Sequence, residues 1–268
     1  MKYVPKELPE GINAPRTNVL AEMALLAGAL VAVAVGLFWV LGLAAERLAV
    51  RTSPELEAAI GERFPLADVG RPVSGREREV LDALLAHTPY EPARFELRVV
   101  CGADDANAFA VPGGRLVVLD PLLDAVRSEN ELAFVLAHEL GHFHHRDHLR
   151  ALGRGLVLVA VLTAVGTGGD FAASLVARSA VAVSHRFSQR QELAADRYAA
   201  ELVQRAYGHA GGLTDFLSHP ALDDAGGWFG THPASRQRVE ALERLARERG
   251  WQAGAVTPYR RSPALCPD

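Results

Sequence analysis

The sequence predicts an α+β domain that follows one N-terminal transmembrane helix. Segments with the apolar, β-branched character of strands come first in the domain, and helical segments follow them. Upstream of the domain, residues 23–45 form an unbroken uncharged stretch, MALLAGALVAVAVGLFWVLGLAA. These two observations set the fold class, and local signals along the chain set the elements.

The uncharged stretch is long enough to cross a bilayer, since 23 residues of helix span about 35 Å against a hydrocarbon core of about 30 Å. A cleaved signal peptide is the alternative. Its apolar region is usually about 7–15 residues long, and its charged prefix is shorter than the 22 residues found here. We therefore predict an uncleaved single-pass anchor in the membrane. Lys2, Lys6 and Arg16 precede it, while Arg47 and Arg51 follow it, which weakly favours a cytoplasmic N-terminus and an extracytoplasmic domain.

Length and charge limit the remaining possibilities. A chain of 268 residues can bury a sizeable core, and its 28 Lys and Arg against 32 Asp and Glu give a formal charge of -4. Because no long basic run occurs, we expect no nucleic-acid partner. The predicted division of the chain is an N-terminal tail (1–22), the anchor (23–45), a helical linker (46–75), the main domain (76–250) and a C-terminal tail (251–268).

The elements of the domain follow from turn and capping signals. A linker helix should open at Ser53–Pro54, and a second helix should cover REREVLDALLAH. The segments RFELRVVC, NAFAVPGG and RLVVLD predict a small antiparallel sheet. Ser128 and Glu131 match a capping box, so a helix should begin there and continue through HELGHFHHRDHLRA. Two more helices are expected in SQRQELAADRYAAELVQRAYG and SRQRVEALERLARERG.

The two cysteines are 165 positions apart and form no CxxC pair. This spacing argues against a disulfide framework and against a thiolate zinc cluster. Cys101 is expected to be a small buried hydrophobe.

The motif HELGH lies on the third predicted helix. His138 and His142 are four residues apart, so both imidazoles point to the same side and can share one tetrahedral metal ion. Glu139 between them can act as a general base toward water. The competing interpretation is a solvated histidine-rich helix face, so the decision depends on the other ligands.

A hydrolytic zinc site needs a third protein ligand. His148 is one candidate, because it has the spacing of the HExxHxxGxxH pattern. However, His145 occupies the glycine position of that pattern, and no methionine follows the site. The other candidate is Glu192. It shares a helix face with Asp196, which could accept the free ring N–H of a ligand histidine.

Four motifs together resemble the HtpX-like and CAAX-prenyl-protease-like zinc metalloproteases, which are gluzincins. They are NAFAVPGG, HELGH, SQRQELAAD and THPASRQR, in the family's order, over residues 75 to 245. The resemblance implies a zincin-like metallopeptidase domain with one Zn²⁺ per chain. It assigns His138, His142 and Glu192 as zinc ligands, Glu139 as general base and Asp196 as the partner of a ligand histidine.

The same resemblance implies roles for two further motifs. In NAFAVPGG, a strand formed by Asn107, Ala108, Phe109, Ala110 and Val111 would pair with the substrate backbone. In THPASRQR, His232 would stabilise an oxyanion or occupy the open metal position in a resting state. Arg236 is the predicted substrate-binding arginine, with Arg238 as the alternative.

Two other features are given simpler interpretations. His144, His145 and His148 are expected on a solvated helix face. The apolar stretch 155–183 is too short for two membrane spans, so we expect a helical hairpin that packs beside the cleft or dips into the bilayer surface.

The sequence thus predicts a membrane-anchored zinc endopeptidase that acts on unfolded or membrane-associated proteins. The alternative is a non-catalytic, zinc-stabilised membrane scaffold or holdase that binds unfolded segments. The presence of Glu139 argues against this alternative, because a purely structural metal site needs no base.

Overall fold

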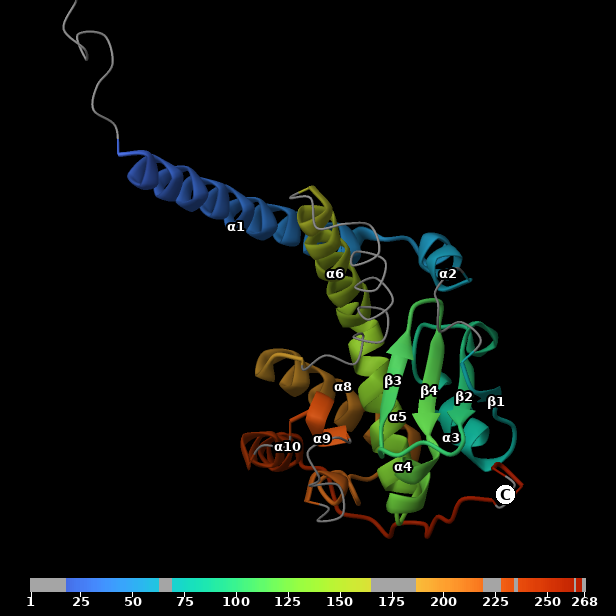
Figure 1. The fold of residues 1–268 in the computed structure, drawn as a ribbon. Coiled ribbons are helices and arrows are strands. Elements are labelled where there is room, and N and C mark those ends of the chain that lie inside the picture. The colour runs from blue at the N-terminus through green and yellow to red at the C-terminus, as the bar shows by residue number, and fades with distance from the viewer. Residues whose placement is uncertain are drawn as a thin grey trace, which may run out of the picture.

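The computed structural model describes residues 18–62, 69–164, 187–218, 228–233, 236–262 and 264–266, of which 155, 156 and 158–164 are described by their backbone alone. It contains a four-stranded sheet, a central helix beside the sheet, and helices that cover the far side of that central helix (Figure 1). A long N-terminal helix projects from this body. The predicted α+β class is confirmed.

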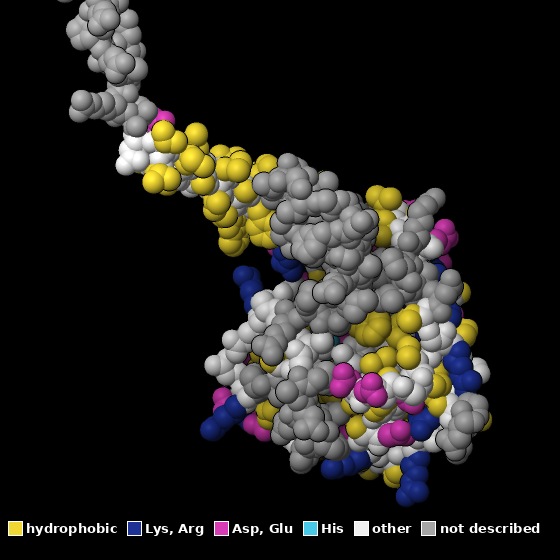
Figure 2. Space-filling view, in the orientation of Figure 1, with side chains coloured by type: hydrophobic (Ala, Val, Ile, Leu, Met, Phe, Trp, Pro, Cys, Tyr) yellow, Lys and Arg dark blue, Asp and Glu magenta, His cyan; other side chains and the backbone are white. Residues whose placement is uncertain are grey.

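Helix α1 (Val19–Arg51) includes the predicted anchor, and by length and composition it could cross a membrane. Figure 2 shows apolar side chains along the visible part of the projecting helix, and none of its most apolar stretch is buried against the domain. Its C-terminal end packs on α6 (Asp147–Ala164), where Arg154 forms a 2.7 Å ion pair with Glu46. The short linker helix α2 (Pro54–Glu62) follows as predicted.

The sheet has the order β1-β2-β4-β3, with β1 at Arg71–Pro72, β2 at Glu96–Val100, β3 at Ala108–Val111 and β4 at Arg115–Leu119. The prediction of an antiparallel sheet is wrong for its central pair, because β2 and β4 are parallel. After β2 the chain crosses to the outer edge to form β3. The tight turn through Gly113 and Gly114, both at positive φ, then returns β4 between β3 and β2.

Helix α5 (Glu129–His144) is central because one side packs against the sheet and α3 (Arg76–Leu85), and the other packs against α8 (Gln189–Tyr207). Its N-cap is as predicted, since the Ser128 hydroxyl accepts the Glu131 N–H at 3.2 Å. The Glu131 carboxylate accepts the N–H of Arg127 instead of that of Ser128. Most apolar residues of α5 are buried in the main core.

The prediction that this helix continues through the later histidines is wrong. Helix α5 ends at His144, and Arg146 takes a left-handed conformation with φ 58° before α6 begins at Asp147. A non-glycine residue is uncommon in this region and needs support from its surroundings. The two helices therefore diverge at a sharp turn. Of the predicted hairpin at 155–183, the structure describes helix up to Ala164, and the rest lies outside the described residues.

The remaining helices among the described residues are α4 (Asp120–Ala125), α9 (Trp228–Thr231) and α10 (Arg236–Arg249), with 3₁₀ turns at Pro92–Arg94 and Phe216–Ser218. Helix α10 packs on α8, on the side of α8 away from the sheet (Figure 1).

The cysteine prediction is also wrong. Cys101 and Cys266 form a disulfide, and Cys101 is exposed. The C-terminal segment runs back along the domain, where the Glu129 N–H donates to the carbonyl of Thr257 and the Tyr259 N–H donates to the carbonyl of Arg127. This return path brings two cysteines together that are far apart in the sequence.

Candidate metal centre

Three helices bring the predicted site residues together. Helix α5 carries His138, Glu139 and His142, α8 carries Glu192, and His232 directly follows α9. The glycine of HELGH makes the approach possible. A Cβ added at Gly141 would lie 2.9 Å from the Cα of Ala195, so α8 can reach this distance from α5 because residue 141 has no side chain.

The donor atoms of His138, His142, Glu192 and His232 all lie within 4.8 Å of one another, and all four side chains are buried. The two Nε2 atoms of His138 and His142 are 3.1 Å apart. The Glu192 carboxylate oxygens lie 3.6 Å from the first and 3.4 Å from the second. His232 Nδ1 lies 3.3 Å from His138 Nε2 and 3.1 Å from Glu192 Oε1.

These separations fit a zinc ion. Ligand atoms at about 2.0–2.1 Å from a tetrahedral ion lie about 3.3–3.4 Å from one another, and imidazole nitrogen with carboxylate oxygen is a common zinc donor set. His232 Nδ1 stands where a fourth ligand would stand. A buried group of three histidines and one carboxylate therefore has the composition and spacing for one metal ion.

Both ligand-candidate histidines on α5 are oriented by carboxylates. His138 Nδ1 lies 2.9 Å from Asp196 Oδ1, and His142 Nδ1 lies 3.0 Å from Asp147 Oδ2. Hydrogen bonds at Nδ1 leave Nε2 free to face the other donors, which is how a carboxylate fixes the tautomer of a metal-binding histidine. Asp147 is itself held by the side-chain amide of Gln191 at 2.8 Å.

Arg238 lies behind the centre and is almost fully buried. Its guanidinium donates to both carboxylate oxygens of Asp196 at 2.7 Å and forms a 2.7 Å ion pair with Glu192. It also donates to the backbone carbonyls of His232 and Pro233. One cation thus fixes two acidic side chains and the segment that carries His232.

Burial and these contacts shift the pKa values of the centre. Burial opposes ionisation of Glu192, but contacts with His232 and His142 outweigh it and hold the carboxyl pKa well below its usual range. Burial lowers the pKa of His138, and it lowers that of His232 to about 3, which favours the neutral imidazole that a metal requires. Burial also lowers the pKa of His142, but hydrogen bonds to Asp147 and Glu192 raise it overall to about 9.

Glu139 lies next to the donor atoms without joining them. One of its oxygens accepts the backbone N–H of Ala110, and Oε1 is 3.6 Å from His232 Nε2. Among the described residues, Oε1 has no hydrogen-bond partner, although it is buried. Burial raises the pKa of Glu139 to about 8. A buried carboxyl with one free oxygen beside a donor cluster can exchange a proton with a small molecule bound there.

The predicted substrate strand forms the free edge of the sheet, because β3 pairs with β4 alone among the described strands. Asn107 accepts from the N–H of Leu119 and also contacts Thr231 through its side chain. Along an antiparallel pair, residues whose backbone groups bond to the partner strand alternate with residues whose backbone groups point away from it. Because Asn107 bonds to Leu119, Ala108 and Ala110 direct their backbone groups away from β4. The Ala110 N–H points toward Glu139 in agreement with this alternation.

Other predicted residues lie elsewhere. The Arg236 side chain is 91% exposed and pairs with Glu240, so the structure brings Arg238 and not Arg236 to the centre. The prediction of a solvated face fails for His148, which is buried and lies 2.7 Å from Glu57. His144 is exposed and bonds to the hydroxyl of Tyr90.

The sequence analysis did not predict several residues that contact the centre. Asp147 follows a helix break that has no glycine or proline to mark it. Phe187 stacks on His142 with ring centroids 3.9 Å apart, and Trp228 stacks on His232 at 4.2 Å. These aromatic residues carry no local motif, although the tryptophan lies three positions before the THP triplet.

An HExxH helix, a glutamate from a later helix and an adjacent sheet edge define a metallopeptidase domain. The chain belongs to peptidase family M48, whose model matches residues 76–246. The resemblance to HtpX-like proteases is therefore confirmed at the level of the family.

Individual relatives agree with this assignment. The chain is 36% identical over 148 residues to metalloprotease LoiP of Escherichia coli, a match that covers 52% of this chain and 58% of LoiP. It is 28% identical over 180 residues to a protease HtpX homolog of Salinibacter ruber (53% and 65%), and 29% identical over 140 residues to mitochondrial metalloendopeptidase OMA1 of Arabidopsis thaliana (51% and 28%). The chain thus covers less than two thirds of the length of each of these relatives.

The ligand set can be tested by metal analysis. We expect Glu192→Ala to lower the zinc content of the purified protein from about one ion per chain to a small fraction, because it removes the carboxylate donor. His144→Ala changes an exposed histidine of the same cluster and should keep the full zinc content. Loss of zinc in His144→Ala, with full zinc content in Glu192→Ala, would argue that zinc binds to the outer histidines.

Proposed function

We propose that this chain is a membrane-anchored, zinc-dependent endopeptidase that hydrolyses peptide bonds of unfolded or membrane-associated proteins. One observation carries the proposal: the free carboxylate oxygen of Glu139 lies beside the buried donor set of His138, His142 and Glu192. A metal site that served structure alone would need no such group. Membership of a peptidase family supports the same reaction.

Zinc held by these residues would polarise the scissile carbonyl and acidify a water molecule. Glu139 would accept a proton from the attacking water and later donate it to the leaving amine. The hydrogen bond from Ala110 keeps its carboxylate in position while Oε1 stays free for the transfer. The Nε2 of His232, 3.6 Å from Glu139, could then donate to negative charge that develops on the carbonyl oxygen.

The substrate backbone would add to the sheet beside β3. The outward carbonyls of Ala108 and Ala110 would accept from its N–H groups, whereas the outward N–H groups already donate to Asn107 and Glu139. This mode of binding requires an extended and therefore unfolded segment. Because backbone contacts dominate, little dependence on side-chain sequence is expected from this strand. Its direct link to Glu139 through Ala110 would hold the bound chain at the level of the base.

We propose further that α1 spans the membrane and that the domain lies outside the cytoplasm. The apolar exposed surface of α1 and the charge bias across it support the span and its orientation. The Cys101–Cys266 disulfide supports an oxidising compartment. Alkylation of membranes from intact cells should leave both cysteines unmodified until a reductant is added, whereas two free thiols would contradict this orientation.

A scaffold or holdase remains the second candidate, because His232 Nδ1 stands at the fourth donor position. Four protein ligands are typical of structural zinc sites. We regard this as a resting arrangement, from which His232 moves aside when substrate binds. The holdase alternative predicts binding of unfolded chains without cleavage.

The deciding experiment is incubation of the detergent-purified, zinc-loaded full chain with an unfolded model protein. We expect fragments from internal cleavage, their disappearance after removal of zinc with a chelator, and their return when zinc is restored. Suppressed aggregation of the model protein without any fragments would instead favour the holdase.

A further inference from the structure

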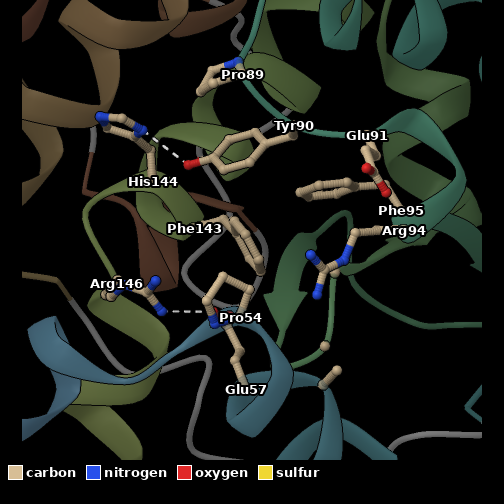
Figure 3. Close-up of a pocket in the computed structure, with 13 residues that line it drawn as sticks. Pro54, Glu57, Pro89, Tyr90, Glu91, Arg94, Phe95, Phe143, His144 and Arg146 are labelled. Atoms are coloured by element: carbon tan, nitrogen blue, oxygen red, sulfur yellow. Dashed lines mark hydrogen bonds and ion pairs between the residues drawn. The ribbon is translucent and has the colours of Figure 1, made fainter.

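The linker helix α2 contacts the domain through two buried residues, Glu57 and Gly61. Beside it lies a cavity of about 520 Å³, with Tyr90, Phe95 and Phe143 in its wall (Figure 3). Glu57 is buried, and an acidic side chain is rarely buried unless charged or polar partners surround it.

The partners of Glu57 flank a residue of the metal centre. One carboxylate oxygen accepts from Arg146 at 2.7 Å, and the other lies 2.7 Å from His148 Nε2. Figure 3 shows the Arg146 guanidinium directed at the Glu57 carboxylate from the turn after α5. Asp147, between these two partners in the sequence, binds His142 at 3.0 Å. Glu57 thus holds both neighbours of the carboxylate that orients a ligand histidine.

This turn needs such support. Arg146 has φ 58°, which an L-residue adopts at a cost unless other contacts maintain it. The contacts of Glu57 with Arg146 and His148 fix the side chains on both sides of Asp147. Without them, the turn could relax toward an ordinary conformation and carry Asp147 away from His142.

The second contact of α2 lies next to the other half of the site. A Cβ added at Gly61 would lie 2.3 Å from the carbonyl oxygen of Pro112, which follows the last residue of β3. The helix that joins α1 to the domain therefore rests on both the turn behind the metal centre and the end of the edge strand.

We propose that Glu57 is a positioning residue for the metal centre: it clamps the turn at Arg146, Asp147 and His148 and thereby keeps Asp147 on His142. The proposal rests on the metal site of the proposed function. It gives the linker helix a role in catalysis, because displacement of α2 would change the orientation of a zinc ligand.

The test is a zinc titration of the full chain in detergent against a chromophoric chelator. We expect Glu57→Ala to weaken zinc binding about tenfold, the lower end of the effect of losing an outer partner of a metal ligand. At saturating zinc, kcat should fall while KM stays constant, because the substrate strand is unchanged. Glu55→Ala removes an exposed carboxylate of the same helix and should match the wild type.

A second substitution separates the clamp from a general loss of stability. Glycine adopts φ 58° without cost, so Arg146→Gly in the Glu57→Ala background should restore zinc affinity to within about threefold of the wild type. Wild-type zinc affinity in Glu57→Ala, or no recovery in the double variant, would overturn the proposal. If Glu57→Ala does not fold, Glu57→Gln takes its place, and wild-type affinity there would overturn it equally. Absence of zinc binding by the wild type would instead overturn the proposed function.

Discussion

Replacing Glu139 by glutamine is expected to slow peptide-bond hydrolysis by at least about 10³-fold, within the range that a positioned general base contributes. The glutamine side chain has nearly the same shape and keeps an oxygen that can accept the Ala110 N–H. However, it cannot take a proton from water or return one to the leaving amine. The zinc content should remain about one per chain, because Glu139 stands outside the donor set.

Initial rates with an unfolded protein substrate and metal analysis of the same preparation measure both parts of this expectation. Glu243→Gln provides a matched control, because Glu243 is an exposed carboxylate on α10 that pairs with Arg247. A Glu139→Gln protein that loses zinc would show that the carboxylate is a ligand. One that keeps both its zinc and its rate would show that another group is the base.

The sequence predicted those site residues that lie close together in the sequence. His138, Glu139 and His142 follow one another on a single helix, so their common side is set by helix geometry alone. Glu192 lies 50 positions after His142 and could be assigned through family resemblance, but its approach depends on the contact between Gly141 and Ala195. That contact is a property of two packed helices and has no local periodic signal.

The residues that the sequence missed depend on tertiary structure. Arg236 and Arg238 are two positions apart, so they face nearly opposite sides of α10. Which of them is buried depends on how α10 docks against α8. The role of Asp147 was not predicted because the sequence around Arg146 indicates a continuous helix. In the structure the helix breaks there, and Arg146 donates to Glu57, about 90 residues earlier in the sequence.

The sheet and the disulfide were mispredicted for a related reason. Strand pairing was inferred from neighbours in the sequence, which suits the β3–β4 hairpin but fails for β2, because β2 pairs with β4 and not with the next strand, β3. Cys101 and Cys266 meet because the C-terminal segment returns across the start of α5. Neither the pairing of β2 with β4 nor the disulfide can be predicted from a pattern within a short stretch of sequence.

The second large effect concerns Arg238. We expect Arg238→Met to lower the free energy of unfolding of the metal-free protein by about 3–5 kcal/mol, the cost of removing one partner from a buried ion pair. Methionine fills part of the volume, but Asp196 and Glu192 would remain buried without their guanidinium. Arg236→Met is the matched control. Its side chain is 91% exposed, so the loss should stay within about 0.5 kcal/mol.

The dependence of this loss on pH and zinc identifies its cause. Burial raises the pKa of Asp196, but hydrogen bonds from Arg238 and His138 lower it overall, so this carboxylate stabilises the folded wild type above its unfolded pKa of about 3.9. That contribution is lost as pH falls through the folded pKa, so the difference between wild type and Arg238→Met should be largest near neutral pH and shrink in acid. Bound zinc would neutralise part of the same negative charge and should also reduce the difference. Denaturant unfolding followed at several pH values, with and without zinc, measures both effects, and a loss that is independent of both would point to packing rather than charge.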